Sequence, residues 1–221
     1  MTRELFEKKL REMQDEILIM GSMVEKAVQR SMEGLRTRNT VLSQGVVEED
    51  VAINAKRYEI EERCIHLIAL QQPMAADLRV VVAILFIANE LERMADHAEG
   101  IARISLMIGD EALPRPLGDI AEMGDRAADM LRRSITAFIE RDDDAARKLC
   151  DEDDAVDNLY DRAYQALIGE MIQSPGEVRS LTYLIWASHN LERIADRVTN
   201  ICERVIFMVT GQLEEINVSR Y

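Results

Sequence analysis

The chain has 221 residues with a formal net charge of −14, and 48% of its residues are hydrophobic while only 5% are aromatic. The negative charge argues against binding to nucleic acid or, by charge alone, to an anionic membrane surface. The longest apolar run, residues 80–88, is far too short to span a bilayer. With only 10 Gly and 4 Pro residues, the composition predicts an all-α protein rather than one built on a sheet.

Apolar residues at helical spacing predict three helices in the first half of the chain. We expect these helices at residues 4–36, 40–70 and 75–108. Asn39 or Thr40 can cap the second helix, and the sequence Gln71-Gln72-Pro73 ends it. The third helix carries the acidic hexapeptide Leu91-Glu92-Arg93-Met94-Ala95-Asp96.

A linker is predicted from Gly109 to Gly118, because Pro114 and Pro116 lie between these two glycines. After it the helical pattern starts again. Three further helices are expected at residues 117–140, 143–172 and 177–211. Ser174-Pro175-Gly176-Glu177 has the sequence of a capping box with proline at the first helical position.

The second half of the chain repeats the first. Met123-Gly124 matches Met20-Gly21 at an offset of 103, and by the last helix of each half the offset is 100. We therefore predict a tandem repeat of two three-helix bundles related by a pseudo-twofold axis. The first bundle would form a domain of residues 1–110 and the second a domain of residues 117–221.

The acidic hexapeptide is part of this repeat, since Leu191-Glu192-Arg193-Ile194-Ala195-Asp196 differs from the first copy only by Ile for Met. In a helix the i, i+4 spacing places Glu92 over Asp96 and Glu192 over Asp196 on one face. Such like-charged pairs destabilise a helix by roughly 0.2–0.5 kcal/mol. Because the acidic pair occurs in both halves of the chain, it suggests that a cation neutralises the paired carboxylates.

The second helix of each bundle carries another polar pair at i, i+4 spacing. These pairs are Asp50 with Asn54, and Asp153 with Asp157. If the second and third helices pack side by side, four oxygen-bearing side chains in each bundle can converge. Such ligands suit iron or another oxygen-ligated cation, namely Mg²⁺, Mn²⁺, Ca²⁺ or Zn²⁺.

A plainer interpretation stays open, in which Arg93 and Arg193 screen the carboxylates while Asp50 or Asp153 lies on a solvated helix face. Repetition of the carboxylates in both halves favours a metal. Among the histidines, His189 precedes Glu192 by one turn on the same face and could join that site.

Signals of catalysis are missing from the sequence. No Glu has a His three residues later, as di-iron carboxylate bundles require, and the chain has neither a Walker-type glycine loop nor a nucleophile elbow. We therefore expect a protein that is not an enzyme. A carboxylate-metal enzyme and a metal-free helical scaffold or chaperone-like protein are the alternatives.

The segment Leu70-Gln71-Gln72-Pro73-Met74-Ala75-Ala76-Asp77-Leu78-Arg79 and the two hexapeptides resemble the PhoU family of bacterial phosphate regulators. The resemblance covers nearly the whole chain and implies two three-helix bundles, a homodimer, and metal bound at the Glu/Asp-x-x-x-Asp motifs. It also implies a cytoplasmic negative regulator of phosphate uptake and of the phosphate-starvation response. Such a regulator is an adapter between the ATPase subunit of the phosphate ABC transporter and a sensor histidine kinase.

Two departures from the family pattern concern the metal sites. Asn54 stands where the second half has Asp157, and residues 174–179 lack the fuller Gln-Pro-x-Ala-x-Asp-Leu-Arg pattern. We therefore expect the two sites to differ in affinity or occupancy.

Overall fold

The computed structural model describes residues 3–109 and 118–216, and within these ranges it contains helices and no strand. The α-helices are α1 (Arg3–Thr37), α2 (Thr40–Gln71), α3 (Ala76–Ile108), α4 (Gly118–Glu140), α5 (Asp143–Gln173) and α6 (Val178–Thr210). A short 3₁₀ helix, η1 (Pro175–Glu177), precedes α6. Most of the predicted linker lies outside the described residues. So do residues 1–2 and 110 of the first predicted domain, and residues 117 and 217–221 of the second.

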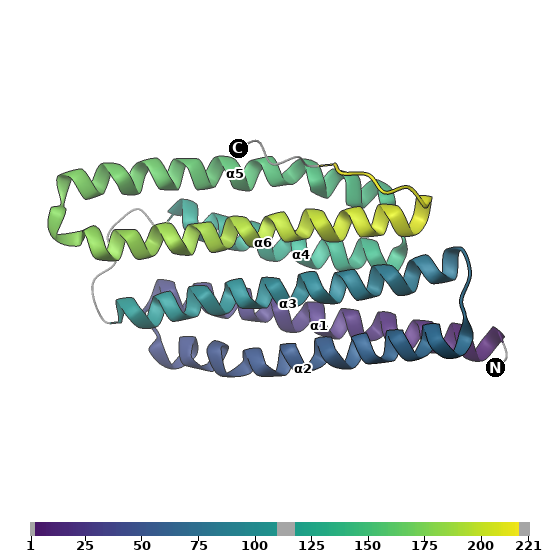
Figure 1. The fold of residues 1–221 in the computed structure, drawn as a ribbon. Coiled ribbons are helices and arrows are strands. Elements are labelled where there is room, and N and C mark those ends of the chain that lie inside the picture. Colours follow the sequence, from purple (N-terminus) through teal and green to yellow (C-terminus); the bar gives the residue numbers. More distant parts are fainter. Residues whose placement is uncertain (1–2, 110–117, 217–221) are drawn as a thin grey trace.

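The helices form the two predicted three-helix bundles, α1–α3 and α4–α6 (Figure 1). α3 and α6 run side by side through the middle of the molecule, α2 and α5 lie at its outer edges, and α1 and α4 lie behind (Figure 1). The buried apolar side chains of both bundles form one contiguous core. The bundles are therefore packed against each other along their whole length, chiefly through α3 and α6.

The two hairpin turns before α2 and α5 show why the helices begin where they do. The side-chain oxygen of Asn39 accepts a hydrogen bond from Leu42 N at 3.0 Å, and that of Asp142 accepts one from Ala145 N at 2.8 Å. Each cap satisfies a backbone N–H that has no partner within its helix. Arg141, which precedes the second cap, has a φ of 56°.

Of the capping box predicted before α6, the proline is confirmed at the first position of the helical turn η1, but the predicted side-chain cap by Ser174 is wrong. The Ser174 hydroxyl donates to Glu170 Oε1 at 3.2 Å and caps no helix, while Glu177 N donates to the Ser174 carbonyl at 2.9 Å. The chain winds into η1, and α6 starts one residue later than Glu177. A 3₁₀ turn satisfies the backbone here, so that the serine side chain is not needed as a cap.

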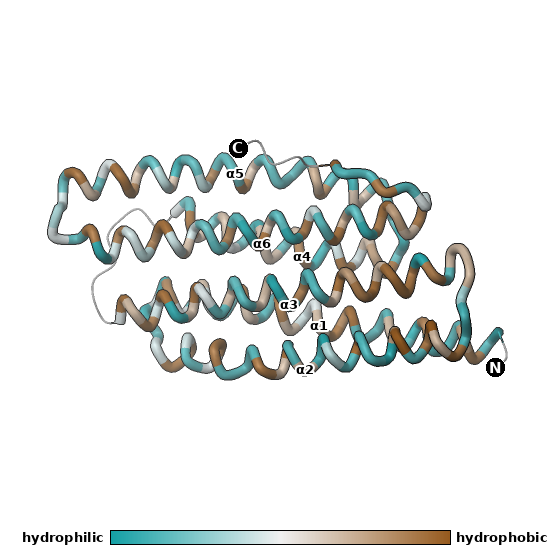
Figure 2. The backbone as a smooth tube through the Cα atoms, viewed as in Figure 1, coloured by the Kyte–Doolittle hydropathy of each residue, from teal (hydrophilic) through white to brown (hydrophobic). Residues whose placement is uncertain are grey.

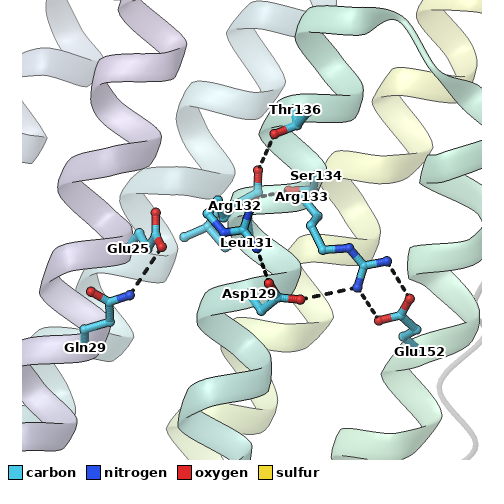
Figure 3. A network of polar contacts seen from close by, with 9 residues as sticks. All are labelled: Glu25, Gln29, Asp129, Leu131, Arg132, Arg133, Ser134, Thr136 and Glu152. Carbon is cyan, nitrogen blue, oxygen red and sulfur yellow. Dashed lines mark hydrogen bonds and ion pairs between the residues drawn. The ribbon is translucent and has the colours of Figure 1, made fainter.

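Equivalent polar contacts hold the two bundles internally. Arg133 makes two hydrogen bonds of 2.7 Å to Glu152 and a longer one of 3.3 Å to Asp129 (Figure 3). In the first bundle Arg30 pairs with Glu49 at the same two positions of the repeat. Both ion pairs join the first helix of a bundle to its second helix.

The interface between the bundles follows the pseudo-twofold axis. Arg197 and Asn200 of α6 both donate to Glu90 Oε2 of α3 at 3.1 Å. At the symmetry-related place, Asn190 of α6 bonds His97 of α3 at 2.9 Å, between Asn190 Oδ1 and His97 Nδ1. One of the two symmetry-related contacts is thus ionic and the other neutral.

Two glycines allow α1 and α4 to approach each other closely behind this interface. A Cβ atom at Gly21 would lie 3.0 Å from Ile135 Cγ1, and one at Gly124 would lie 2.9 Å from Met32 Cγ. These glycines are equivalent in the sequence repeat. Each bundle therefore contributes one glycine to the close contact between α1 and α4.

Within the described ranges, no helix is both long and apolar enough to cross a membrane.

Candidate metal centre

The strongest candidate for a metal centre lies in the second bundle, where α5 packs beside α6. Carboxylate oxygens of Asp153, Asp157 and Asp196 lie within 4.8 Å of one another. Asp153 and Glu192 are buried, with 2% and 6% of their surface exposed. Both members of the α5 pair and Asp196 of the α6 pair therefore converge, and these three carboxylates are close enough to share one cation.

The electrostatics of this cluster favour a cation. Burial, and then the carboxylates of Asp157, Asp196 and Glu192 in that order, together raise the pKa of Asp153 to about 7. Burial and the neighbouring carboxylates also raise the pKa of Asp157 to about 6. The pKa of Asp196 is raised by burial and then by Glu192. These three carboxyl groups therefore bind protons more tightly than free aspartates do, and a bound cation would take the place of those protons.

Two cationic or ionisable groups lie at the edge of the cluster. Arg193 pairs with Asp196, one turn along α6. His189 Nδ1 lies 3.4 Å from Glu192 Oε2, so this histidine is beside the cluster where the sequence placed it. The screening role expected of Arg193 is thus real for one carboxylate. The solvated-face interpretation is wrong for Asp153, because that residue is buried.

In the first bundle the equivalent residues are arranged differently. Asn54 Nδ2 donates to Asp50 Oδ2 at 2.7 Å, while the buried Oδ1 of Asp50 accepts no hydrogen bond from any described residue. Burial, and then Glu99, Asp96 and Glu92, together raise the pKa of Asp50 to about 6. Among the described residues, the first bundle has no group of three acidic ligand atoms as close as those in the second.

Two residues of this first cluster were missed by the sequence reasoning. Among the charged residues, Glu99 raises the pKa of Asp50 the most, and it forms an ion pair of 2.6 Å with Arg103. Arg57 points its Nε toward Glu92 Oε1 at 3.8 Å. Helical spacing could have placed both residues on the acidic faces, because Glu99 follows Asp96 by three residues and Arg57 follows Asn54 by three, but it does not show which groups they meet on the neighbouring helix.

The two donor sets therefore differ in how well they fit a metal ion. Hard cations such as Mg²⁺ and Mn²⁺ take oxygen ligands, preferably charged carboxylates. The second bundle supplies four carboxylates from two helices, namely Asp153, Asp157, Glu192 and Asp196. The first supplies the carboxylates of Asp50, Glu92, Asp96 and Glu99 together with an amide, Asn54, and Glu92 and Glu99 each lie beside a guanidinium. The second set suits a metal ion better than the first, because three of its carboxylates lie within 4.8 Å of one another and none of its donors is an amide.

Comparison with known proteins gives consistent matches along the chain. The family model described as the PhoU domain matches twice, at residues 17–105 and 120–205. A Clostridium acetobutylicum protein named phosphate-specific transport system accessory protein PhoU homolog is 37% identical, covering 98% of this chain and all of that protein. An Aquifex aeolicus protein of the same name is 32% identical over 93% of each chain. The crystal structure of PhoU from Pseudomonas aeruginosa has a TM-score of 0.90 and 33% identity, covering 94% of this chain and 100% of that one.

Proposed function

The chain belongs to the PhoU family, and from this premise we propose that it is a cytoplasmic accessory and regulatory protein of phosphate-specific transport. In this role it restrains phosphate uptake and the phosphate-starvation response while phosphate is plentiful. The observation that carries the proposal is the similarity over nearly the full length of both chains to relatives that bear this name.

The proposed mode of action is that of an adapter. The two bundles offer long exposed helix faces, and the net charge of −14 favours basic surfaces on a partner. The partners proposed are the ATPase subunit of the phosphate transporter and a sensor histidine kinase, with the adapter acting as a homodimer. Contacts of this electrostatic kind should weaken as salt is raised.

A divalent cation in the second bundle is part of the proposal. Asp153, Asp157, Glu192 and Asp196 would hold it, and His189 lies close enough to Glu192 to orient that carboxylate. The cation would supply the positive charge that four clustered carboxylates need in order to stay ionised side by side. Iron, Mg²⁺, Mn²⁺, Ca²⁺ and Zn²⁺ are the candidates.

Deletion of the gene tests the regulatory role. We expect the deletion strain to express its phosphate-starvation genes in high phosphate, and the wild-type gene to restore repression when it is supplied in trans. A reporter fused to a starvation promoter measures this. Normal repression and normal phosphate uptake in the deletion strain would contradict the proposal and favour a metal enzyme or a plain helical scaffold.

A further inference from the structure

The repeat places different residues at one position of the acidic clusters. Three residues after Asn54 on α2 comes Arg57, whereas three residues after Asp157 on α5 comes Tyr160. Arg57 and Tyr160 occupy equivalent positions at the offset of 103 that relates the second helices of the two bundles. A permanent cation in one cluster therefore corresponds to a neutral phenol in the other.

Arg57 is held in place on three sides. Its Nη1 donates to Glu61 Oε2 at 2.7 Å, its Nε lies 3.8 Å from Glu92 Oε1, and its guanidinium lies over the ring of Tyr58 at 3.9 Å from the centroid. Only 18% of the side chain is exposed. A planar guanidinium that is paired and stacked in this way is pre-organised, and it holds its positive charge beside the acidic cluster.

From these contacts we infer that Arg57 is the built-in cation of the first acidic cluster, and that this bundle takes no metal ion while the second bundle takes one. The inference rests on the metal site proposed above for the second bundle. It assigns Arg57 and Asn54 the role of excluding a metal that the family pattern would otherwise place beside Glu92 and Asp96.

Electrostatics explain the exclusion. A divalent cation held by Glu92 would lie beside the Arg57 guanidinium, and two positive charges so close in a partly buried site repel each other strongly. Asn54 adds to this because its Nδ2 already donates to Asp50, and an amide brings no negative charge to the site. Glu99, the extra carboxylate on α3, is paired with Arg103.

The second bundle lacks these obstacles on α5, and the guanidinium that pairs with Asp196 there, Arg193, comes from α6. Asp157 brings a carboxylate in place of the amide, and the Tyr160 ring lies against His189 with centroids 6.2 Å apart. The residue equivalent to Glu99 is Thr199, whose hydroxyl donates to the carbonyl of Asp196. At the position where α2 has the Arg57 guanidinium, α5 therefore has no cationic group that could take the place of a metal ion.

Titration of the chelated full-length protein with Mn²⁺, followed by calorimetry and by electron paramagnetic resonance, tests the inference. The wild type should bind about one Mn²⁺ per chain with carboxylate ligands. The double variant Asn54→Asp/Arg57→Tyr copies the second bundle and should bind about two. The matched double variant Asp157→Asn/Tyr160→Arg copies the first bundle and should lose the ion.

Several results would overturn the inference. These are two equivalent ions or no ion in the wild type, an unchanged stoichiometry in Asn54→Asp/Arg57→Tyr, or retention of the ion in Asp157→Asn/Tyr160→Arg. Circular dichroism checks that each variant is helical, and Asp153→Asn, which should also lose the ion, serves if the Tyr160→Arg variant does not fold. None of these outcomes changes the expected deletion phenotype, so a failure of the inference is distinguishable from a failure of the proposed function.

Discussion

The helices α2 and α5 occupy equivalent places in the two bundles, yet they present different groups to the acidic hexapeptides. α2 brings Asn54 and Arg57, and α5 brings Asp157 and Tyr160. By contrast, the N-caps of α2 and α5 and the close approach of α1 and α4 at Gly21 and Gly124 are duplicated. The two copies therefore share a scaffold and differ in the chemistry that the scaffold positions.

The outer faces of the same two helices differ as well. Val41 and Val51 of α2 are 81% and 71% exposed, and the equivalent residues of α5 are Asp144 and Asp154. In Figure 2 the teal of hydrophilic residues dominates α5, whereas α2 carries several brown stretches. Divergence at exposed positions, where packing does not restrict the residue type, separates the surfaces that the two bundles offer to partners.

The largest expected effect that sharpens this comparison is the pH dependence of the metal-free protein. Burial raises the pKa of Asp153 from its ordinary 3.8 to about 7, so the folded state holds this proton more tightly than the unfolded chain does. Its contribution is complete below about pH 4 and is lost as the pH rises to 7, by on the order of 4 kcal/mol. Urea unfolding in chelator at several pH values measures it.

Two matched variants show which bundle causes this dependence of stability on pH. Asp153→Asn should remove more of the loss in stability between pH 4 and pH 7 than Asp50→Asn, because burial raises the pKa of Asp50 only to about 6. Equal effects of the two variants would mean that the two clusters are electrostatically alike, and the comparison would fail.

The second prediction concerns the interface between α3 and α6. Arg197→Ala should lower the free energy of unfolding by about 3 kcal/mol, because it leaves Glu90, only 13% exposed, without its ionic partner. His97→Ala removes the equivalent neutral contact and should cost about 1 kcal/mol. Burial lowers the pKa of His97, so this contact stays neutral at pH 7.

Urea unfolding at pH 7 gives both values. The double variant Glu90→Asn/Arg197→His copies the neutral contact and should recover most of the stability lost in Arg197→Ala. A cost for His97→Ala as large as that for Arg197→Ala would show that the charge difference between the two contacts has no energetic consequence.

The third prediction uses a small difference in core packing. In the first bundle a Cβ at Gly34 would collide with the Ser43 hydroxyl, which donates to Ser105 Oγ at 2.9 Å. The second bundle has Ala137 and Ala146 at the positions of Gly34 and Ser43. Gly34→Ala should therefore cost about 1–2 kcal/mol despite the better helix propensity of alanine.

Adding Ser43→Ala should restore most of that stability, because it reproduces the pairing of the second bundle. The matched control Ala137→Gly should cost about 1 kcal/mol through helix propensity. Thermal melts followed at the helical band measure all three. If Gly34→Ala were as stable as the wild type, the two bundles would tolerate the same side chains at this place.

The smallest expected effect is at the outer face of α2. Val41→Asp and Val51→Asp copy Asp144 and Asp154, and they should change the free energy of unfolding by less than about 0.5 kcal/mol because both valines are exposed. An aspartate at position 41 also lies in the first turn of α2, where the helix dipole favours it. A loss above about 1 kcal/mol would indicate that this face is covered, for example by a second copy of the chain.

The sequence was sufficient to predict most of the fold. Periodicity, caps and prolines place the six helices within a residue or two of their observed bounds, and the repeat predicts the two bundles. The capping box at Ser174 failed because a local pattern does not show whether the backbone will wind into a 3₁₀ turn. The contact between the bundles through α3 and α6 depends on side chains about a hundred residues apart, which periodicity does not relate.

The acidic clusters were predicted only in part for the same reason. Spacing along one helix shows that Glu192 and Asp196 share a face, and it also indicates Asp153 and Asp157. Which groups meet across two helices depends on their axial register. That register brings Arg57 to Glu92 and Glu99 toward Asp50, and neither contact follows from a single-helix pattern.

The most direct test of the divergence between the two clusters is anomalous X-ray diffraction from crystals of the full chain soaked in Mn²⁺. We predict a single strong anomalous peak between α5 and α6, next to the carboxylates of Asp153, Asp157 and Asp196, with the Arg57 guanidinium unmoved beside Glu92. Peaks of equal height in both bundles, or a peak beside Asp50 alone, would contradict the account.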